Sequence, residues 1–128
     1  MSRSINLHAL SPTDSSHEAN TPVTDGQAIT GFLHSVESGA AVDGPGMRCV
    51  LFMSGCQFRC LYCHNPDTWL YNGGEEYTPE ALVKKIERFK TYFASSGGGV
   101  TFSGGDPLRQ PQFLLETLKL CKNKGIHT

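Results

Sequence analysis

Met47-Arg48-Cys49-Val50-Leu51-Phe52-Met53 is followed, after Ser54-Gly55, by the loop Cys56-Gln57-Phe58-Arg59-Cys60-Leu61-Tyr62-Cys63-His64-Asn65. The first seven residues are nearly all apolar, which is typical of a strand buried on both faces of a parallel sheet. Three of the chain's five cysteines then fall within eight residues. The sequence therefore predicts a buried strand that ends in a cysteine-rich loop.

The spacing of these cysteines, Cys-x3-Cys-x2-Cys, lets one loop carry three thiolates, which are the usual ligands of iron–sulfur clusters. A cubane cluster normally takes four cysteines, so three would leave one iron open to a small molecule. Structural zinc is the alternative, and His64 or Cys49 could supply its fourth ligand. Zinc sites usually use two separated ligand pairs, and the chain has no second pair, which favours the cluster.

The composition excludes several classes of protein. The chain has 128 residues, a net charge of −1 and no basic patch, which argues against binding nucleic acid through a cationic surface. No apolar run approaches a membrane span, and the first residues resemble neither a secretory signal nor a transit peptide. An odd number of clustered cysteines favours a reducing compartment. These features predict a cytoplasmic protein that does not bind membranes.

Downstream of the loop, the pattern changes from strand to helix. Thr78-Pro79-Glu80 combines an N-cap, a proline at the first helical position and an acid near the positive end of the helix dipole. One apolar face of this predicted helix follows at helical spacing, and Gly97-Gly98-Gly99 ends it. The members of that face are Leu82, Val83, Ile86, Phe89 and Phe93.

A second strand and helix follow. Residues 100–103 predict a short strand, Gly104-Gly105-Asp106-Pro107 the loop after it, and Pro111 the start of a helix that ends at Gly125. Residues 126–128 predict the beginning of a third strand. The expected apolar face of the second helix comprises Leu114, Leu115, Leu118 and Cys121. Cys49 and Cys121 are predicted to be small core residues rather than ligands.

The domain organisation predicted is a disordered tail over residues 1–27 and a partial domain over residues 28–128. Residues 28–36 are expected to form an extended edge segment, and residues 71–77 a polar connection. Alternation of strand and helix implies an α/β fold with right-handed parallel crossovers. Because two parallel strands cannot close a core, the fold is expected to be truncated.

The pattern Cys-x3-Cys-x-Tyr-Cys after a buried strand resembles the radical S-adenosylmethionine (SAM) superfamily. Four further stretches resemble the glycyl-radical enzyme activating family, in particular the activating enzymes of pyruvate formate-lyase. These are Val42-Asp43-Gly44-Pro45-Gly46-Met47-Arg48, Tyr62-Cys63-His64-Asn65, Gly97-Gly98-Gly99-Val100-Thr101 and Ser103-Gly104-Gly105. The resemblance covers residues 31–128 and implies the N-terminal portion of an incomplete parallel (β/α)6 barrel, with its site at the carboxyl ends of the strands.

The resemblance also implies ligands for the cofactors. Cys56, Cys60 and Cys63 would bind three irons of a [4Fe–4S] cluster, and the amino and carboxylate groups of SAM would chelate the fourth iron. Tyr62 and His64, which flank Cys63, would lie along the adenosine.

Gly104, Gly105 and Asp106 match the family's glycine-glycine-acid loop, which receives the amino end of the methionine part of SAM. Glycines allow close approach of the backbone, and an acid complements an ammonium group. This chain has Asp106 where the family usually has glutamate, so the charge is kept and the reach is one methylene shorter.

The implied activity is reductive cleavage of SAM to install a glycyl radical on pyruvate formate-lyase, with an electron donor such as flavodoxin. No side-chain acid or base is required, so no separate catalytic residue is predicted. Between Cys63 and Gly97 there is no cysteine-rich insertion, which favours the pyruvate formate-lyase type. Two alternatives stay open: an inactive fragment of such an enzyme, and a small zinc or iron–sulfur binding module.

Overall fold

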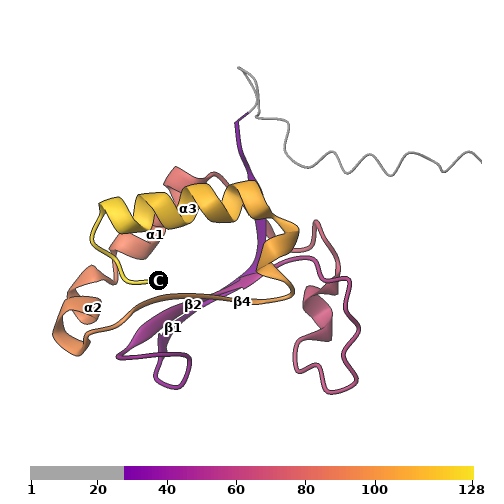
Figure 1. Ribbon diagram of the computed structural model, residues 1–128, viewed down its shortest axis with the longest axis horizontal. Coiled ribbons are helices and arrows are strands. Elements are labelled where there is room, and N and C mark those ends of the chain that lie inside the picture. Colours follow the sequence, from indigo (N-terminus) through magenta and orange to yellow (C-terminus); the bar gives the residue numbers. More distant parts are fainter. Residues whose placement is uncertain (1–27) are drawn as a thin grey trace, which may run out of the picture.

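The computed structural model describes residues 28–128, so the tail predicted for residues 1–27 lies outside the described residues. Helices cover one face of a four-stranded sheet (Figure 1). Two 3-10 helices, η2 (Pro66–Trp69) and η3 (Pro107–Arg109), lie in the loops within this range. The strands and α-helices, in chain order, are β1 (Gly31–Ala40), β2 (Arg48–Met53), β3 (Glu75–Tyr77), α1 (Pro79–Glu87), α2 (Lys90–Ser96), β4 (Gly99–Gly104) and α3 (Pro111–Asn123).

The sheet is mixed, with the strand order β3-β1-β2-β4. β2 and β4 are parallel and in register from Arg48 opposite Gly99 to Met53 opposite Gly104. β1 is antiparallel to both β2 and β3. The expectation of parallel pairing therefore holds for β2 and β4, and for an isolated parallel bridge between Gly99 and His127, at the predicted start of a third strand. The connection between β1 and β2, residues 41–47, is too short for a parallel crossover and allows a hairpin instead.

Two strand expectations are wrong in detail. The extended segment expected over residues 28–36 is β1, which lies inside the sheet rather than at its edge. The polar connection expected over residues 71–77 ends in β3, which pairs Glu75 with Leu33 and Tyr77 with Gly31. β3 lies at the end of the described sheet, where polar side chains can face solvent, so its sequence lacks the apolar signal of a buried strand.

The helix caps predicted from the sequence are present. The Thr78 hydroxyl accepts a hydrogen bond from the Ala81 amide at 3.2 Å and begins α1. Gly97, at φ +70°, ends α2 in the left-handed conformation. The single helix expected between Pro79 and Gly97 is instead α1 and α2, separated at Arg88 and Phe89. Both phenylalanines still contact the core, so the predicted apolar face is confirmed.

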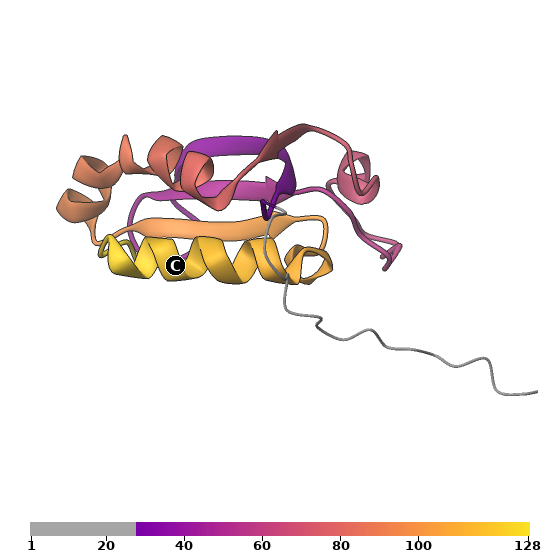
Figure 2. The same ribbon diagram turned by 90° about the horizontal axis from the view of Figure 1, so that it is seen from above.

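The core lies between the sheet and α1 with α3, which run side by side over it (Figure 2). On α3 the fully buried residues are Phe113, Thr117 and Cys121, whereas Leu115 is half exposed, so the predicted apolar face is displaced by part of a turn. The Thr117 hydroxyl donates to the Phe113 carbonyl at 2.7 Å, which satisfies a polar group inside the core. The most deeply buried members of this core are Leu33, Leu51, Met53, Leu82, Ile86, Val100, Phe113 and Cys121.

Arg48 is a buried charge inside an otherwise apolar strand, with 3% of its surface exposed. Its guanidinium donates to the Thr101 hydroxyl at 2.6 Å, the Val100 carbonyl at 2.6 Å and the Pro45 carbonyl at 3.0 Å. These bonds tie the turn before β2 to β4 and offset the cost of removing the charge from water. Among the described helices, none is long and apolar enough to cross a membrane.

Candidate functional site

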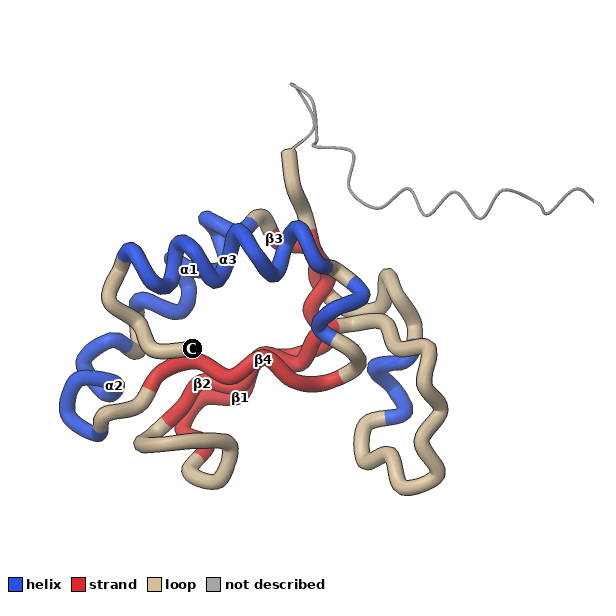
Figure 3. Tube along the Cα trace, in the orientation of Figure 1, coloured by secondary structure: helices blue, strands red, loops and turns tan. Residues whose placement is uncertain are grey.

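The carboxyl ends of β2 and β4 lie next to each other because the two strands are parallel and in register (Figure 3). The Gly105 amide donates to the Met53 carbonyl at 2.9 Å, and the Asp106 amide donates to the Gly55 carbonyl at 2.8 Å. The cysteine loop, which follows β2, and the glycine loop, which follows β4, therefore leave the sheet as hydrogen-bonded neighbours. This is the arrangement expected where parallel strands build a site at one edge.

The glycine loop requires glycine because its backbone contacts the backbone of the cysteine loop. Gly104 adopts φ +95°, a conformation that side chains disfavour. A Cβ on Gly105 would lie 2.4 Å from the Gly55 carbonyl oxygen, closer than any van der Waals contact. The backbones of the two loops can thus approach only because position 105 has no side chain.

Asp106 has a structural role in this loop. Its carboxylate accepts a hydrogen bond from the Leu108 amide at 3.0 Å and so caps η3. An acid at a helix N-cap satisfies an otherwise unpaired amide. The Asp106 side chain is half-buried, and its predicted contact with the amino end of SAM stays a prediction.

The three loop cysteines are free thiols at the protein surface. Cys56 and Cys63 are half-buried and Cys60 is exposed. The Cys63 amide donates to the Cys60 carbonyl at 3.2 Å, which closes a turn between the last two cysteines. The Cys56 amide donates to the carbonyl of Trp69, the last residue of η2, at 3.2 Å. The end of η2 therefore lies next to the start of the cysteine loop.

Tyr62 and His64, predicted to lie along the adenosine of SAM, are exposed on either side of Cys63. Tyr62 has 84% of its surface accessible, and its neighbour Leu61 is also fully exposed. Phe58 on the same loop is 59% exposed. The cysteine loop therefore presents apolar and aromatic groups to its surroundings, next to the three thiols.

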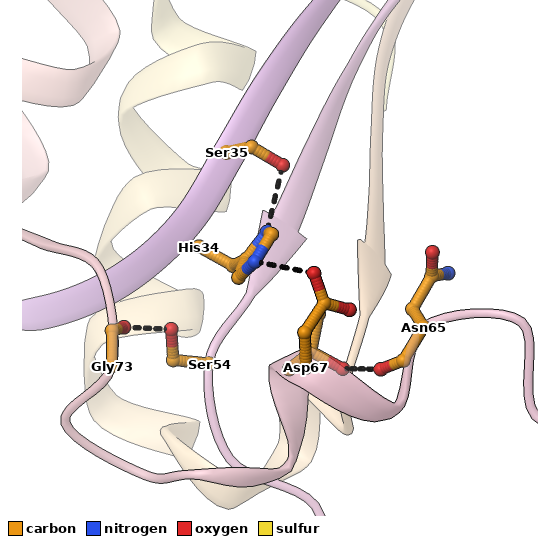
Figure 4. A network of polar contacts seen from close by, with 7 residues as sticks. His34, Ser35, Ser54, Asn65, Asp67 and Gly73 are labelled. Carbon is orange, nitrogen blue, oxygen red and sulfur yellow. Dashed lines mark hydrogen bonds and ion pairs between the residues drawn. The ribbon is translucent and has the colours of Figure 1, made fainter.

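Polar contacts fasten the segment after the cysteines to the sheet (Figure 4). His34 Nε2 on β1 lies 2.8 Å from Asp67 Oδ2 on η2, and His34 Nδ1 lies 3.0 Å from the Ser35 hydroxyl. The Ser54 hydroxyl donates to the Gly73 carbonyl, at the far end of the same segment. Residues 55–74 are thus fixed at both ends while the cysteines lie between.

Gln110 is a part of the site that the sequence analysis missed. The residue is 4% exposed, and its amide oxygen accepts from the Phe32 amide at 2.7 Å. Its Nε2 donates to the carbonyls of Phe32 and Ser54, both at 2.9 Å. One side chain therefore joins β1, the end of β2 and the start of α3. No periodicity marks such a residue, because its role depends on contacts across 56 and 78 positions of sequence.

The donor set of the cysteine loop fits an iron–sulfur cluster. Three thiols on one surface loop match the preferred ligand of such clusters. Within residues 28–128, no three side chains of Cys, His, Asp or Glu are grouped around one point as a single metal ion would require. Each thiolate of a cubane binds a separate iron, so the three sulfurs need not converge on one point.

A cavity of about 230 Å³ lies at the opposite end of β2, away from both loops. Aromatic side chains of α2 and of the segment before it form one wall, and the β1–β2 hairpin forms the other. It is therefore separate from the cysteine site. Its lining residues are Ser38, Gly39, Met47, Arg48, Cys49, Phe89, Tyr92 and Phe93.

A comparison with protein families matches residues 42–128 to the model described as "4Fe-4S single cluster domain". The matched region begins before β2 and contains the cysteine loop, the glycine loop and α3. The chain belongs to the 4Fe–4S single cluster domain family. Membership implies a single [4Fe–4S] cluster, for which the loop cysteines are the donors that fit.

Curated relatives of this 4Fe–4S single cluster domain are named pyruvate formate-lyase-activating enzymes. The protein from Clostridium pasteurianum is 62% identical over 100 residues, which are 78% of this chain and 42% of the relative. That from Staphylococcus epidermidis is 54% identical over 101 residues, covering 78% and 40%. The pyruvate formate-lyase 1-activating enzyme of Escherichia coli is 48% identical over 101 residues, covering 79% and 41%. The chain spans about two fifths of the length of these relatives.

Alkylation should divide the five cysteines of this 4Fe–4S single cluster domain into two groups. Burial raises the pKa of Cys49 and of Cys121 from 9.0 to about 11. Near pH 8 their reactive thiolate fraction should fall roughly a hundredfold. Iodoacetamide on the folded, metal-free chain should therefore label three thiols quickly, those of Cys56, Cys60 and Cys63, and the other two only after unfolding. Mass spectrometry of samples taken over time counts the labelled cysteines. Labelling of all five at one rate would contradict the burial of Cys49 and Cys121.

The raised pKa values of Cys49 and Cys121 also make the stability of the fold depend on pH. In the folded chain Cys49 and Cys121 hold their protons more tightly than in the unfolded chain. Their contribution is fully present below pH 9.0 and is lost as the pH rises from there toward about 11. The free energy of unfolding should accordingly fall over this alkaline range.

Proposed function

We propose that this chain carries the cluster and part of the SAM site of a radical SAM activating enzyme, whose substrate is the glycyl-radical enzyme pyruvate formate-lyase. The names of relatives at 48–62% identity support the assignment. The observation that carries it is the pairing of the cysteine loop with the glycine loop through the Gly105 and Asp106 amides. A cofactor that bound both loops would be fixed at two points, because both loops leave the same edge of the sheet.

Cys56, Cys60 and Cys63 are the proposed ligands of three irons. Because the loop offers three thiolates to a cluster that has four irons, one iron is left for the amino and carboxylate groups of SAM. When bound, the reduced cluster would supply the electron that cleaves SAM. The loop's own task is to fix the position of that open iron relative to the glycine loop.

The glycine loop is proposed to receive the methionine end of SAM. Gly104 and Gly105 leave the backbone accessible to a ligand, and the Asp106 carboxylate complements an ammonium group. Tyr62 and His64 flank the last cysteine and are proposed to lie along the adenosine. No proton is moved by a side chain in this scheme, so these residues bind and orient rather than act as acid or base.

Partners and location belong to the same proposal. Pyruvate formate-lyase would present its glycine to the open face of the site, and a small reductant such as flavodoxin would reduce the cluster. The cytoplasm is the proposed location, and five free thiols agree with a reducing compartment. In the longer relatives, the residues outside the matched region are proposed to complete the wall that excludes water from the reacting groups.

Electron paramagnetic resonance tests this function. Pyruvate formate-lyase is incubated without oxygen with the reconstituted protein, SAM and a reductant. A chain extended to the length of the relatives should produce a glycyl radical signal, and the 128-residue chain should produce little, because an open site leaves reaction geometry loose. No signal from the extended chain, with its cluster intact, would overturn the proposal.

A further inference from the structure

Arg59 adopts a backbone conformation that residues with side chains rarely take. Its φ is +85°, and it is the one non-glycine residue at positive φ within residues 28–128. This region brings Cβ close to the following carbonyl, so such residues persist where other contacts hold them. Arg59 directly precedes Cys60. Contacts that hold the Arg59 backbone therefore also determine the path of the loop between Cys56 and Cys60.

Contacts with Trp69 and Cys56 hold the Arg59 side chain. Its guanidinium carbon lies 4.5 Å from the centroid of the Trp69 ring, and its Nη1 donates to the Cys56 carbonyl. The Trp69 carbonyl in turn accepts from the Cys56 amide at 3.2 Å. The three residues form a closed unit, in which each contacts the other two.

We propose that Arg59 is a positioning residue for the cysteine loop, and that its stacking on Trp69 and its bond to Cys56 hold the turn that places Cys60. A guanidinium suits this task because it can stack on a ring and donate in its own plane at once, which an ammonium group cannot. Arg59 is also the only lysine or arginine between residues 49 and 83. A second guanidinium reaches the loop from outside this range, since Arg109 Nη1 donates to Gln57 Oε1 at 3.5 Å. The proposal rests on the proposed function only in taking this loop to bind the cluster.

The metal-free chain allows a direct test, because Trp69 is its only tryptophan. Arg59→Gln should expose the Trp69 ring and so raise the quenching of its fluorescence by acrylamide. The equilibrium between the open and the closed loop should shift roughly two- to tenfold toward the open loop, as expected for the loss of one cation–π contact. Arg59→Lys should fall in between. Arg88→Gln removes the same charge from an exposed position at the end of α1 and serves as the matched control.

A glycine–alanine pair separates the side-chain contacts from the turn itself. Arg59→Gly and Arg59→Ala both remove the contacts with Trp69 and Cys56. Glycine accepts φ +85° without steric cost, whereas alanine favours leaving it. After reconstitution, iron loss to a chelator should therefore be slowest in the unchanged chain, faster with glycine and fastest with alanine. Equal rates in all three would overturn the proposal.

The coupling between Arg59 and Trp69 gives the last test. Arg59→Gln and Trp69→Ala should each speed iron loss roughly two- to tenfold. The double variant should lose iron no faster than the faster single variant, because both substitutions remove the same Arg59–Trp69 contact. Additive effects, or quenching in Arg59→Gln equal to that in Arg88→Gln, would refute the role of Arg59. If even the unchanged chain took up no iron and sulfide, the proposed function would fail, while the fluorescence of the metal-free chain would still decide on Arg59.

Discussion

Replacing Cys60 by alanine should abolish binding of the iron–sulfur cluster. Cys60 lies between the other two loop cysteines and is exposed, so its thiol has no packing role in the fold. Losing even an outer-shell partner of a metal ligand typically costs about 10–100-fold in affinity, and the loss of a direct ligand should cost more. Anaerobic reconstitution followed by gel filtration should leave Cys60→Ala colourless. Cys56→Ala and Cys63→Ala should behave in the same way.

Cys121→Ala is the control for this prediction. Cys121 is fully buried on α3, and alanine in its place removes only a small core side chain. The variant should lose some stability, of the order of 1 kcal/mol, but should keep the coloured cluster. A colourless Cys121→Ala, or a cluster retained by Cys60→Ala, would show that the ligands have been assigned to the wrong residues.

Gly105→Ala should separate the two loops of the site. The new Cβ would lie 2.4 Å from the Gly55 carbonyl oxygen, and backbone cannot swing aside as a flexible side chain can. Overpacking of this kind typically costs about 1–3 kcal/mol of stability. The hydrogen bonds from the Gly105 and Asp106 amides to the end of β2 should weaken with it. We expect a lower free energy of unfolding and a marked loss of SAM binding by the reconstituted chain.

Gly73→Ala is a matched substitution in the segment that follows the cysteines. A Cβ there would meet Leu70 at 3.5 Å, an ordinary contact, and Gly73 has no positive φ. Its effect should stay within about 0.5 kcal/mol, as for most surface changes. Equal losses in Gly73→Ala and Gly105→Ala, measured by denaturant unfolding, would mean that close approach of the two loops is not what requires glycine at position 105.

The parallel pair of strands and its loops could be predicted from the sequence because their signals are local. An apolar run marks β2, a proline and a threonine mark the start of α1, and glycines mark the loop after β4. That the two loops meet follows from one rule, since parallel strands end at the same edge of a sheet. The structure bears this out through the register from Arg48 and Gly99 to Met53 and Gly104.

What the sequence did not reveal depends on distant contacts. β3 is three residues of polar sequence whose strand character comes only from pairing with β1. Arg48 is buried because four groups far along the chain and in the preceding turn surround its guanidinium. Gln110 joins three elements through its amide, and no spacing rule predicts this. The positive φ of Arg59 likewise follows from Trp69 and Cys56 rather than from residue type.

The central claim is that three cysteines of one loop bind a [4Fe–4S] cluster. Analysis of iron, acid-labile sulfide and zinc in the anaerobically reconstituted chain tests it most directly. The account predicts about four irons and four sulfides per chain, as a cubane requires, with no stoichiometric zinc. One tightly bound zinc per chain without sulfide would contradict it.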